Sequence, residues 1–258
     1  MIWIGTSGYS FKDWVGPFYP PGTKTGDMLE FYAARFPAVE INASYYRLPT
    51  AETFARMAAR TPPGFRFTVK FHRAITHELT RDASAYRSFL RVIEPLEASG
   101  KFHGALAQFP WSFRDTPANR DYLRQLRRLY PVLPLFVEFR HDSWANERAF
   151  DFLRQLEAGF CAVDEPKLNG LFPPLIEATS PVAYVRFHGR NAESWWGGDN
   201  AERYNYLYTE DELAEWAEKI RQLETRTREV LVFFNNCHSG RAAQNAKRMA
   251  ELLDLPGI

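Results

Sequence analysis

The most constraining feature of the chain is a regular alternation of short runs rich in β-branched and aromatic residues with longer segments of helical period. The short runs number eight and cover residues 2–6, 38–42, 65–72, 104–109, 135–140, 160–164, 182–188 and 230–235. In the longer segments apolar residues recur at i, i+3, i+4 and i+7, as in Leu213, Trp216, Ala217 and Ile220. Repeated units of this kind predict a parallel sheet covered by helices, because a parallel connection needs a crossover long enough to hold a helix.

Eight strand–helix units favour a closed (β/α)8 barrel of the TIM type over an open doubly wound sheet. Barrels of this type use about 250 residues as one domain, so we predict a single domain over residues 1–258. The segment 165–181 contains four prolines and no apolar stripe, and we therefore expect the sixth helix to be short or irregular. The sequence has no G-x-G-x-x-G or P-loop motif, which disfavours a nucleotide-binding Rossmann fold.

Several helix boundaries are visible in the sequence. Thr116 before Pro117 is typical of an N-cap followed by the first helical residue, and Thr209 with Glu212 fits a capping box. Gly159 is expected to end the helix before the sixth strand.

Overall charge and composition exclude some classes of function. The chain has 32 lysines and arginines against 31 aspartates and glutamates, so no overall field draws it to nucleic acid or anionic lipid. No apolar run is long enough to cross a membrane, and MIWIGTSG lacks the features of a secretion signal. We expect a cytoplasmic protein without a membrane partner, in which Cys161 and Cys237 are reduced thiols.

Alternation within the strands predicts which side chains face the barrel lumen. In 65–72, Phe67 and Val69 alternate with Thr68 and Lys70, and the strands 38–42, 135–140 and 182–188 alternate in the same way. If the apolar set lies beneath the helices, the polar set converges on the lumen near the carboxyl ends of the strands. This polar set consists of Glu40, Asn42, Lys70, His72, Glu138, Arg140, Arg186 and His188, with Gln108, Asp164 and Asn235 as further members.

Such a concentration of charge predicts a functional site, because burying unpaired ions costs several kcal/mol each and barrel enzymes carry their active sites at this face. A purely structural ion-pair network of Glu40, Lys70, Glu138 and Arg186 is the alternative. For His188 and His72, the alternative to a catalytic role is a structural one. Three further histidines are expected to be peripheral, namely His77, His103 and His141.

Aromatic residues add a second layer to the predicted site. Trp195 and Trp196 precede Gly197, Gly198 and Asp199, a combination that suits a lid or a stacking platform for a sugar or a base. Simple capping of the barrel mouth is the alternative. The other rings that follow predicted strands are Tyr45, Tyr46, Trp111, Trp144, Tyr204 and Tyr206.

Five segments also resemble the YecE-like family, domain of unknown function 72: GTSGYSFKDWVGPFYP, FPAVEINASYYRLP, FRFTVKFHRAITH, YVRFHGR and VFFNNCHSGRAAQNAKRM. The resemblance covers residues 1–253 and implies a barrel fold, but no settled activity. Cys237-His238 departs from the family pattern, which leaves the role of His238 open. The family pattern coincides with residues 5–8 and with Glu40, Asn42, Lys70, Arg73, His77, Arg186, His188, Gly189, Arg190, Asn235, Asn236 and Asn245.

The first functional hypothesis is an enzyme, a hydrolase or an isomerase, that acts on an anionic, phosphorylated or sugar-like substrate. Phosphoester hydrolysis is one version of it. Arginine offers a bidentate fork to phosphate or carboxylate, and paired acid and base groups suit proton transfer. We assign catalysis to Lys70, to Glu40 or Glu138 as base, and to His188, with His72 as the alternative acid. Substrate binding is assigned to Asn42, His72, Arg73, Arg140, Arg186, Arg190, Trp195, Trp196, Asn235 and Asn236.

Three alternatives stay open. No cofactor is predicted, although a divalent metal held by Glu138, Asp164 and His188 would assist hydrolysis. Lys70 could form a Schiff base, but nearby carboxylates would raise its pKa and oppose this. A different class is a non-catalytic barrel that binds a nucleotide, a nucleic-acid end or a single strand. The carboxylates favour an enzyme, because a pure anion binder gains nothing from them.

Overall fold

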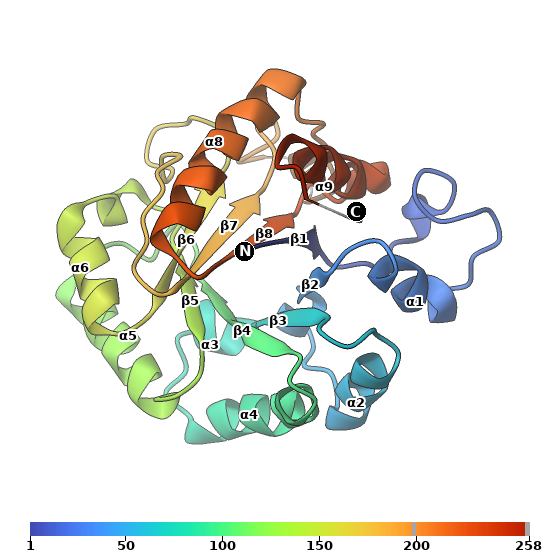
Figure 1. Ribbon diagram of the computed structural model, residues 1–258. Coiled ribbons are helices and arrows are strands. Elements are labelled where there is room, and N and C mark those ends of the chain that lie inside the picture. Colours follow the sequence, from blue (N-terminus) through green and yellow to red (C-terminus); the bar gives the residue numbers. More distant parts are fainter. Residues whose placement is uncertain (198–199, 256–258) are drawn as a thin grey trace.

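The computed structural model is a closed barrel in which eight parallel strands follow one another in chain order (Figure 1). The structure describes residues 1–197 and 200–255, without the side chains of residues 200 and 201. The (β/α)8 architecture expected from the sequence is confirmed. The strands are β1 (Ile2–Ser7), β2 (Ala38–Ile41), β3 (Arg66–Lys70), β4 (Phe102–Gln108), β5 (Leu135–Glu138), β6 (Gly159–Asp164), β7 (Val182–Phe187) and β8 (Glu229–Phe234).

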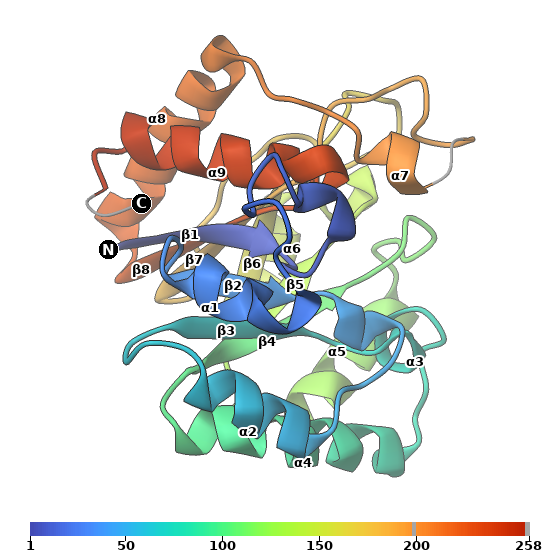
Figure 2. The same cartoon turned by 90° about the vertical axis from the view of Figure 1, so that its right-hand side faces the viewer.

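Helices surround the barrel on all sides (Figure 1), and Figure 2 shows α8 and α9 on one side of the strands and α2 and α4 on the other. Residues 165–181, between β6 and β7, are all described and contain no helix, as the prolines predicted. The α-helices are α1 (Met28–Ala33), α2 (Ala51–Ala59), α3 (Arg73–Thr76), α4 (Ala83–Ala98), α5 (Pro117–Leu129), α6 (Glu147–Gln155), α7 (Asn200–Arg203), α8 (Glu210–Arg226) and α9 (Arg241–Leu252). Short 3-10 helices are η1 (Lys12–Trp14), η2 (Thr25–Asp27), η3 (Ala43–Tyr45), η4 (Asp142–Trp144) and η5 (His238–Gly240).

Local capping chemistry sets the helix starts that the sequence predicted. The Thr116 side chain accepts a hydrogen bond from the Asn119 N–H at the start of α5, and Thr209 opens α8 with a complete capping box. The expected helix end at Gly159 is wrong, because α6 ends at Gln155 and Gly159 is the first residue of β6. A Cβ at Gly159 would lie 2.5 Å from the Phe136 ring, so the glycine serves strand packing.

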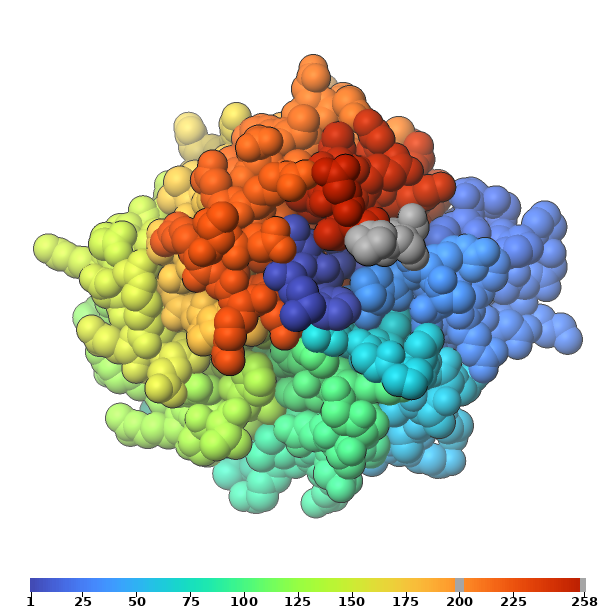
Figure 3. Space-filling model, in the orientation of Figure 1, coloured from blue at the N-terminus to red at the C-terminus, as the bar shows by residue number. Residues whose placement is uncertain are grey.

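The apolar face of each strand packs beneath the helices, as the alternation predicted. Phe71 contacts Phe89 of α4 with ring centroids 4.4 Å apart, and Phe139 stacks on Trp144 at 4.1 Å. The polar face turns into the lumen, where Tyr184 of β7 donates a hydrogen bond to Glu40 of β2 across the barrel. The chain segments follow one another around the molecule in Figure 3, and the first residues fill the centre of the face shown there.

Gly5 allows β1 to approach β2 closely near the lumen. A Cβ on Gly5 would lie 2.0 Å from the Ala38 carbonyl oxygen, far inside van der Waals contact. The Tyr32 hydroxyl accepts from the Thr6 N–H at 2.8 Å and donates to the Ala38 carbonyl at 3.0 Å, which ties α1 to both strands. This local arrangement places Ser7, at the carboxyl end of β1, beside the polar lumen.

Candidate functional site

A buried arginine lies at the centre of the lumen. Nη2 of Arg186 donates to Oε1 of Glu40 at 2.7 Å, and Nη1 donates to Oε2 of Glu138 at 2.6 Å. Arg186 is 1% exposed and both glutamates are 0% exposed. Burial opposes ionisation of Glu138, but Arg186 and Arg140 outweigh it and hold its pKa well below the usual range. β2, β5 and β7 are therefore joined by ions that compensate one another.

Arg140 forms the next layer toward the mouth of the barrel. Its Nε lies 2.7 Å from Oε1 of Glu138, and its Nη1 donates to Oε2 of Glu165 at 2.7 Å. Burial raises the pKa of Glu165 to about 8, with Arg140 opposing the shift. At neutral pH Glu165 is therefore mainly a protonated carboxyl group.

His188 is held as a neutral ring within this network. Burial and the charge of Arg140 lower its pKa well below the usual value. The Asn235 amide nitrogen lies 3.1 Å from Nδ1, and Oε1 of Glu138 lies 3.2 Å from Nε2. When Nδ1 accepts from Asn235, the proton of the neutral ring is on Nε2 and is donated to Glu138, and Nη2 of Arg140 lies 3.1 Å from the same nitrogen. His188 thus orients Glu138.

Lys70 differs from its charged neighbours, because its amine has no hydrogen-bond or ion-pair partner among the described residues. Nζ lies 4.6 Å from the centre of the Tyr45 ring. Burial, together with the positive charge of Arg186, lowers the pKa of Lys70 to about 7 against the opposing effect of Glu138. The carboxylates raise the pKa of Lys70, as the sequence led us to expect, but burial and the charge of Arg186 lower it by more.

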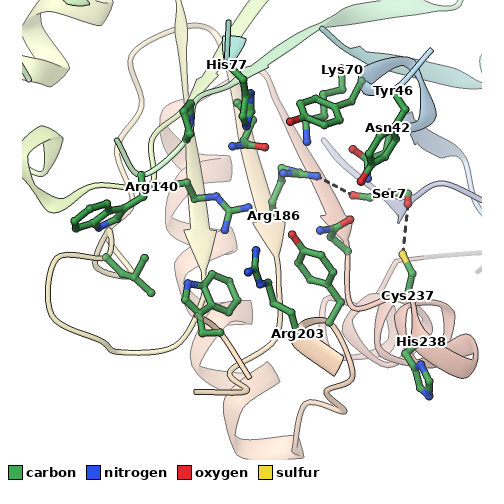
Figure 4. Close-up of a pocket in the computed structure, with 18 of the residues that line it drawn as sticks. Ser7, Asn42, Tyr46, Lys70, His77, Arg140, Arg186, Arg203, Cys237 and His238 are labelled. Atoms are coloured by element: carbon green, nitrogen blue, oxygen red, sulfur yellow. Dashed lines mark hydrogen bonds between the residues drawn. The ribbon is translucent and has the colours of Figure 1, made fainter. Parts of the chain in front are cut away.

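The carboxyl ends of the strands surround a cavity of about 590 Å³ (Figure 4). Lys70, Arg140 and Arg186 reach it from the barrel, and Arg203 reaches it from α7. Aromatic side chains form much of the wall. The remaining lining residues are Ser7, Phe11, Asp13, Asn42, Tyr45, Tyr46, His77, Gln108, Pro110, Trp111, Leu171, Trp195, Trp196, Tyr204, Asn235, Cys237 and His238.

The residues that the sequence assigned to catalysis or substrate binding divide into three groups, two of which belong to this site. Seven of them line the cavity: Asn42, Lys70, Arg140, Arg186, Trp195, Trp196 and Asn235. Three lie in the buried network and are 0% exposed: Glu40, Glu138 and His188. Two of the predicted catalytic carboxylates are therefore placed to hold Arg186 and Arg140, while Lys70 is at the surface of the cavity.

Several predicted substrate-binding residues lie away from the cavity. β3 ends at Lys70, so His72 lies outside the lumen, where its Nδ1 accepts from the Ala74 N–H at the start of α3. Arg73 is largely exposed and pairs with Glu78. Asn236 donates to the side chain of Asn245 and to the Tyr206 carbonyl. These residues follow the ends of the strands, where the in–out alternation of a strand no longer applies. Local hydrogen bonds determine where their side chains lie.

Asp164 and Arg190 pair with each other on the outer side of the barrel. Asp164 accepts from Arg190 at 2.7 Å and from the indole of Trp216 on α8, which covers that side. The expected lumen position of Asp164 is therefore wrong, and the predicted metal set of Glu138, Asp164 and His188 is not brought together. Across the residues that the structure describes, no three His, Cys, Asp or Glu side chains form a group that could hold a metal ion.

Sequence reasoning missed several residues of the site. His77 lines the cavity instead of lying at the periphery, and burial with the charge of Lys70 lowers its pKa to about 4. Glu165 directly follows a predicted strand, so the strand-end rule could have found it. No sequence signal marks Arg203. His103 and His141 do not line the cavity, as expected.

The aromatic layer combines buried and exposed rings. Trp195 is 3% exposed, with the guanidinium carbons of Arg140 and Arg203 5.7 and 5.6 Å from its ring. Trp196 is 56% exposed and packs edge-on against Trp111 at 5.6 Å. Two residues of the predicted lid, at positions 198 and 199, lie outside the described residues. Trp144 and Tyr206 pack elsewhere, against Phe139 and Tyr208.

Both cysteines are free thiols, as predicted. Sγ of Cys237 lies 3.4 Å from the Ser7 carbonyl oxygen, and burial raises its pKa well above the usual value. The thiol is therefore protonated and part of the cavity wall. His238 also lines the cavity, which gives the unusual Cys237-His238 pair a position at the site.

An eight-stranded parallel barrel with a cation-lined cavity at its carboxyl end belongs to the TIM-barrel class, with its site where barrel enzymes carry theirs. The family model described as protein of unknown function DUF72 matches residues 3–257, so the chain belongs to this family and the resemblance is confirmed. It is 34% identical to the UPF0759 protein YunF of Bacillus subtilis (strain 168) over 272 residues, covering 99% of this chain and 95% of that protein.

Solved structures of the same family have the same fold. A DUF72 family protein from Thermotoga maritima is 43% identical, with a TM-score of 0.92 over 98% of this chain and 99% of that one. One from Enterococcus faecalis is 30% identical, with a TM-score of 0.89 over 99% of this chain and 96% of that one. Among the described residues, no helix is both long and apolar enough to span a membrane.

Proposed function

We propose that the protein is an enzyme of isomerase type that acts on a small anionic substrate, phosphorylated or sugar-like, in the cavity at the carboxyl ends of the strands. The observation that carries this proposal is Lys70, an amine with a pKa of about 7 on the wall of a cavity that arginines also line. A group that titrates near the operating pH serves proton transfer best, because both of its forms are populated.

The charges around the cavity support an anionic substrate. Arg140 and Arg186 are neutralised mainly by Glu138 and Glu40, and Glu165 carries little charge at neutral pH. A proton on Lys70 therefore adds a positive charge that neither Glu138 nor Glu40 neutralises, and Asp13 is the acidic residue of the cavity wall. The guanidinium of Arg203 adds a second positive group that has no ion-pair partner among the described residues. Phosphate or carboxylate complements both.

The position of the carboxylates favours isomerisation over hydrolysis. Hydrolysis requires a base or a metal that activates water, and the predicted bases Glu40 and Glu138 are buried in pairs with arginine. The uncharged amine of Lys70 accepts a proton directly from a substrate. Glu138 and Glu40 then act as positioning residues for the arginines.

The size and the walls of the cavity fit a small polar molecule. A volume of about 590 Å³ falls within the range of small-molecule sites, roughly 300–1,000 Å³. The rings of Tyr45 and Trp196 provide faces on which a sugar can pack. A substrate of three to six carbons with one anionic group matches both features.

The test pairs each sugar phosphate with the same sugar lacking phosphate. Titration calorimetry should detect glucose 6-phosphate or glyceraldehyde 3-phosphate but not glucose or glyceraldehyde, and Arg203→Gln should weaken binding about tenfold or more, since each charge-assisted hydrogen bond contributes ~1.5–3 kcal/mol. Proton NMR in deuterium oxide should show exchange beside the substrate carbonyl, lost in Lys70→Met. Equal binding of charged and uncharged sugars would overturn the proposal.

The exposed ring of Trp196 supports a second candidate function. In this alternative the barrel binds a nucleotide or a single-stranded nucleic-acid end and catalyses no reaction. Trp196 and Trp111 together offer a surface on which a base can stack. In that case short oligonucleotides would bind with an affinity that Trp196→Ala lowers and Lys70→Met leaves unchanged. No proton exchange would occur in any sugar phosphate.

A further inference from the structure

The chain contains two buried lysines, and they differ in what their amines contact. Nζ of Lys101 donates to the carbonyls of Ala58 and Thr61, both at 2.6 Å, and to the Thr61 hydroxyl at 3.0 Å. All three donors of Lys101 are thus used in holding the fold. The Lys70 residue is as little exposed as Lys101, yet within the described residues its Nζ has no hydrogen-bond or ion-pair partner and lies 4.6 Å from the centre of the Tyr45 ring. Lys70 therefore has its amine free toward a cavity.

The neighbours of Lys70 suit a nucleophilic amine. Arg186 is a permanent cation that disfavours protonation of the lysine, and burial acts in the same direction, so its pKa is about 7. The Tyr45 ring also contacts His77, whose imidazole stays neutral because burial and the charge of Lys70 lower its pKa to about 4. Oδ1 of Asn42, which lines the same cavity, is buried without a hydrogen-bond partner among the described atoms.

Figure 4 shows Lys70 beside Asn42 and Tyr46 on one side of the cavity and Arg203 on the other, with Arg186 between them. A substrate with two different groups fits this arrangement. Its anionic group is held by Arg203, which lines the cavity and has no ion-pair partner among the described residues, and its reactive group lies at Lys70. The unpartnered Oδ1 of Asn42 is an acceptor for the N–H of the carbinolamine that precedes an imine at Lys70.

From this geometry we infer that Lys70 forms a covalent imine with an anionic aldehyde or ketone whose phosphate or carboxylate is held by the arginines of the cavity. The inference rests on the proposed function and deepens it, because it names the substrate class and the bond that is formed. An imine draws electrons from the neighbouring carbon and makes its proton easier to remove. Imine formation is thus a route to isomerisation that needs no metal.

The reaction balances without a further reagent. The uncharged amine attacks the carbonyl carbon, the new C–N bond forms, and the carbonyl oxygen becomes a hydroxyl group. One amine proton goes to the carbonyl oxygen to make that hydroxyl, the second reaches the hydroxyl through water, and the oxygen leaves as water. One amine and one carbonyl give one imine and one water, with no change of oxidation state. Hydrolysis reverses each step and releases the product.

The test traps the imine by reduction. The full-length protein is incubated with glycolaldehyde phosphate or with glyoxylate, together with sodium cyanoborohydride, which supplies hydride to the imine and leaves a stable secondary amine. Mass spectrometry of the intact protein and of its peptides then locates the modification. Glycolaldehyde without phosphate is the matched uncharged probe, and Lys101 is the internal control for a buried lysine without a free amine.

We expect Lys70 to be modified at least tenfold faster than any other lysine by one of the two anionic probes, and tenfold slower by glycolaldehyde. Excess inorganic phosphate should protect it, Lys101 should stay unmodified, and Lys70→Arg should remove the fast reaction while keeping the circular dichroism of the folded protein. The rate should rise with pH through about 7, whereas surface lysines need a pH near about 10.

Two results would overturn the inference, and calorimetry with inorganic phosphate separates them. If phosphate binds and neither anionic probe labels Lys70 preferentially, the imine is wrong and the proposed function stands with Lys70 as a base. If phosphate does not bind and labelling is spread over the surface lysines, the inference and the proposed function both fail.

Discussion

Arg186 and Glu138 form a hydrogen-bonded ion pair of 2.6 Å across the barrel, and neither side chain is more than 1% exposed. The pair joins β7 to β5, while the other amino group of Arg186 reaches Glu40 on β2. Charges buried to this degree are tolerated only when each has its partner. Arg186 therefore contributes to the fold as well as to the cavity wall.

Arg186→Met should lower the free energy of unfolding by about 3–5 kcal/mol, because it leaves Glu40 and Glu138 without their cation. Urea denaturation at pH 7 measures the loss. The surface pair Arg56–Glu52 provides the control, and Arg56→Met should cost less than about 1 kcal/mol. Equal losses in the two variants would show that the buried network is not structural.

Glu165→Gln should change the pH dependence of stability. Between the ordinary pKa of a glutamate and about 8, the folded protein keeps a proton on Glu165 that the unfolded chain has released, so the free energy of unfolding falls as pH rises through this range. Glutamine preserves the shape and removes the titration. The variant should gain on the order of 4 kcal/mol relative to the wild type between pH 5 and pH 8.5. Parallel pH profiles from urea denaturation would contradict the raised pKa.

Sulfate should bind more weakly as pH rises through 7, because the proton on Lys70 supplies the positive charge and is lost with a pKa of about 7. Sulfate keeps its own charge over this range, and the decrease should approach about tenfold per pH unit. Calorimetry in buffers of different ionisation enthalpy should detect proton uptake. In Lys70→Met the affinity should be lower and independent of pH between 6 and 7.5, where Glu165 stays protonated.

Substitutions of Trp195 and Trp196 should have different effects, the first on the stability of the fold and the second on ligand binding. Trp195 is buried, so Trp195→Ala should cost about 3–5 kcal/mol in unfolding free energy by thermal or urea denaturation. Trp196 is 56% exposed, and Trp196→Ala should cost less than about 1 kcal/mol. If Trp196 is part of the binding surface, its removal should weaken sugar-phosphate binding without unfolding the protein. A large loss of stability in Trp196→Ala would instead assign the ring to packing.

The sequence by itself determined the barrel and much of the lumen. Strand and helix periods differ, and β-strand alternation is strict, so Glu40, Lys70, Glu138 and Arg186 could all be assigned to the inner face from their apolar neighbours. The prolines of 165–181 likewise predicted the missing helix, because proline lacks the N–H that a helix interior needs. These inferences depend only on local backbone geometry.

Only the tertiary structure decided which of these charges meet and which face the cavity. Glu40 and Glu138 resemble catalytic carboxylates in the sequence, but both are consumed in pairing with Arg186, which comes from a strand far along the chain. Residues just beyond a strand lose its alternation, so His72 caps a helix. Asp164 is the last residue of β6, where Cys161 faces Glu138 in the lumen, and alternation from Cys161 turns Asp164 outward to Arg190. The pKa of Lys70 depends on burial and on the nearby Arg186, and both arise when the barrel closes.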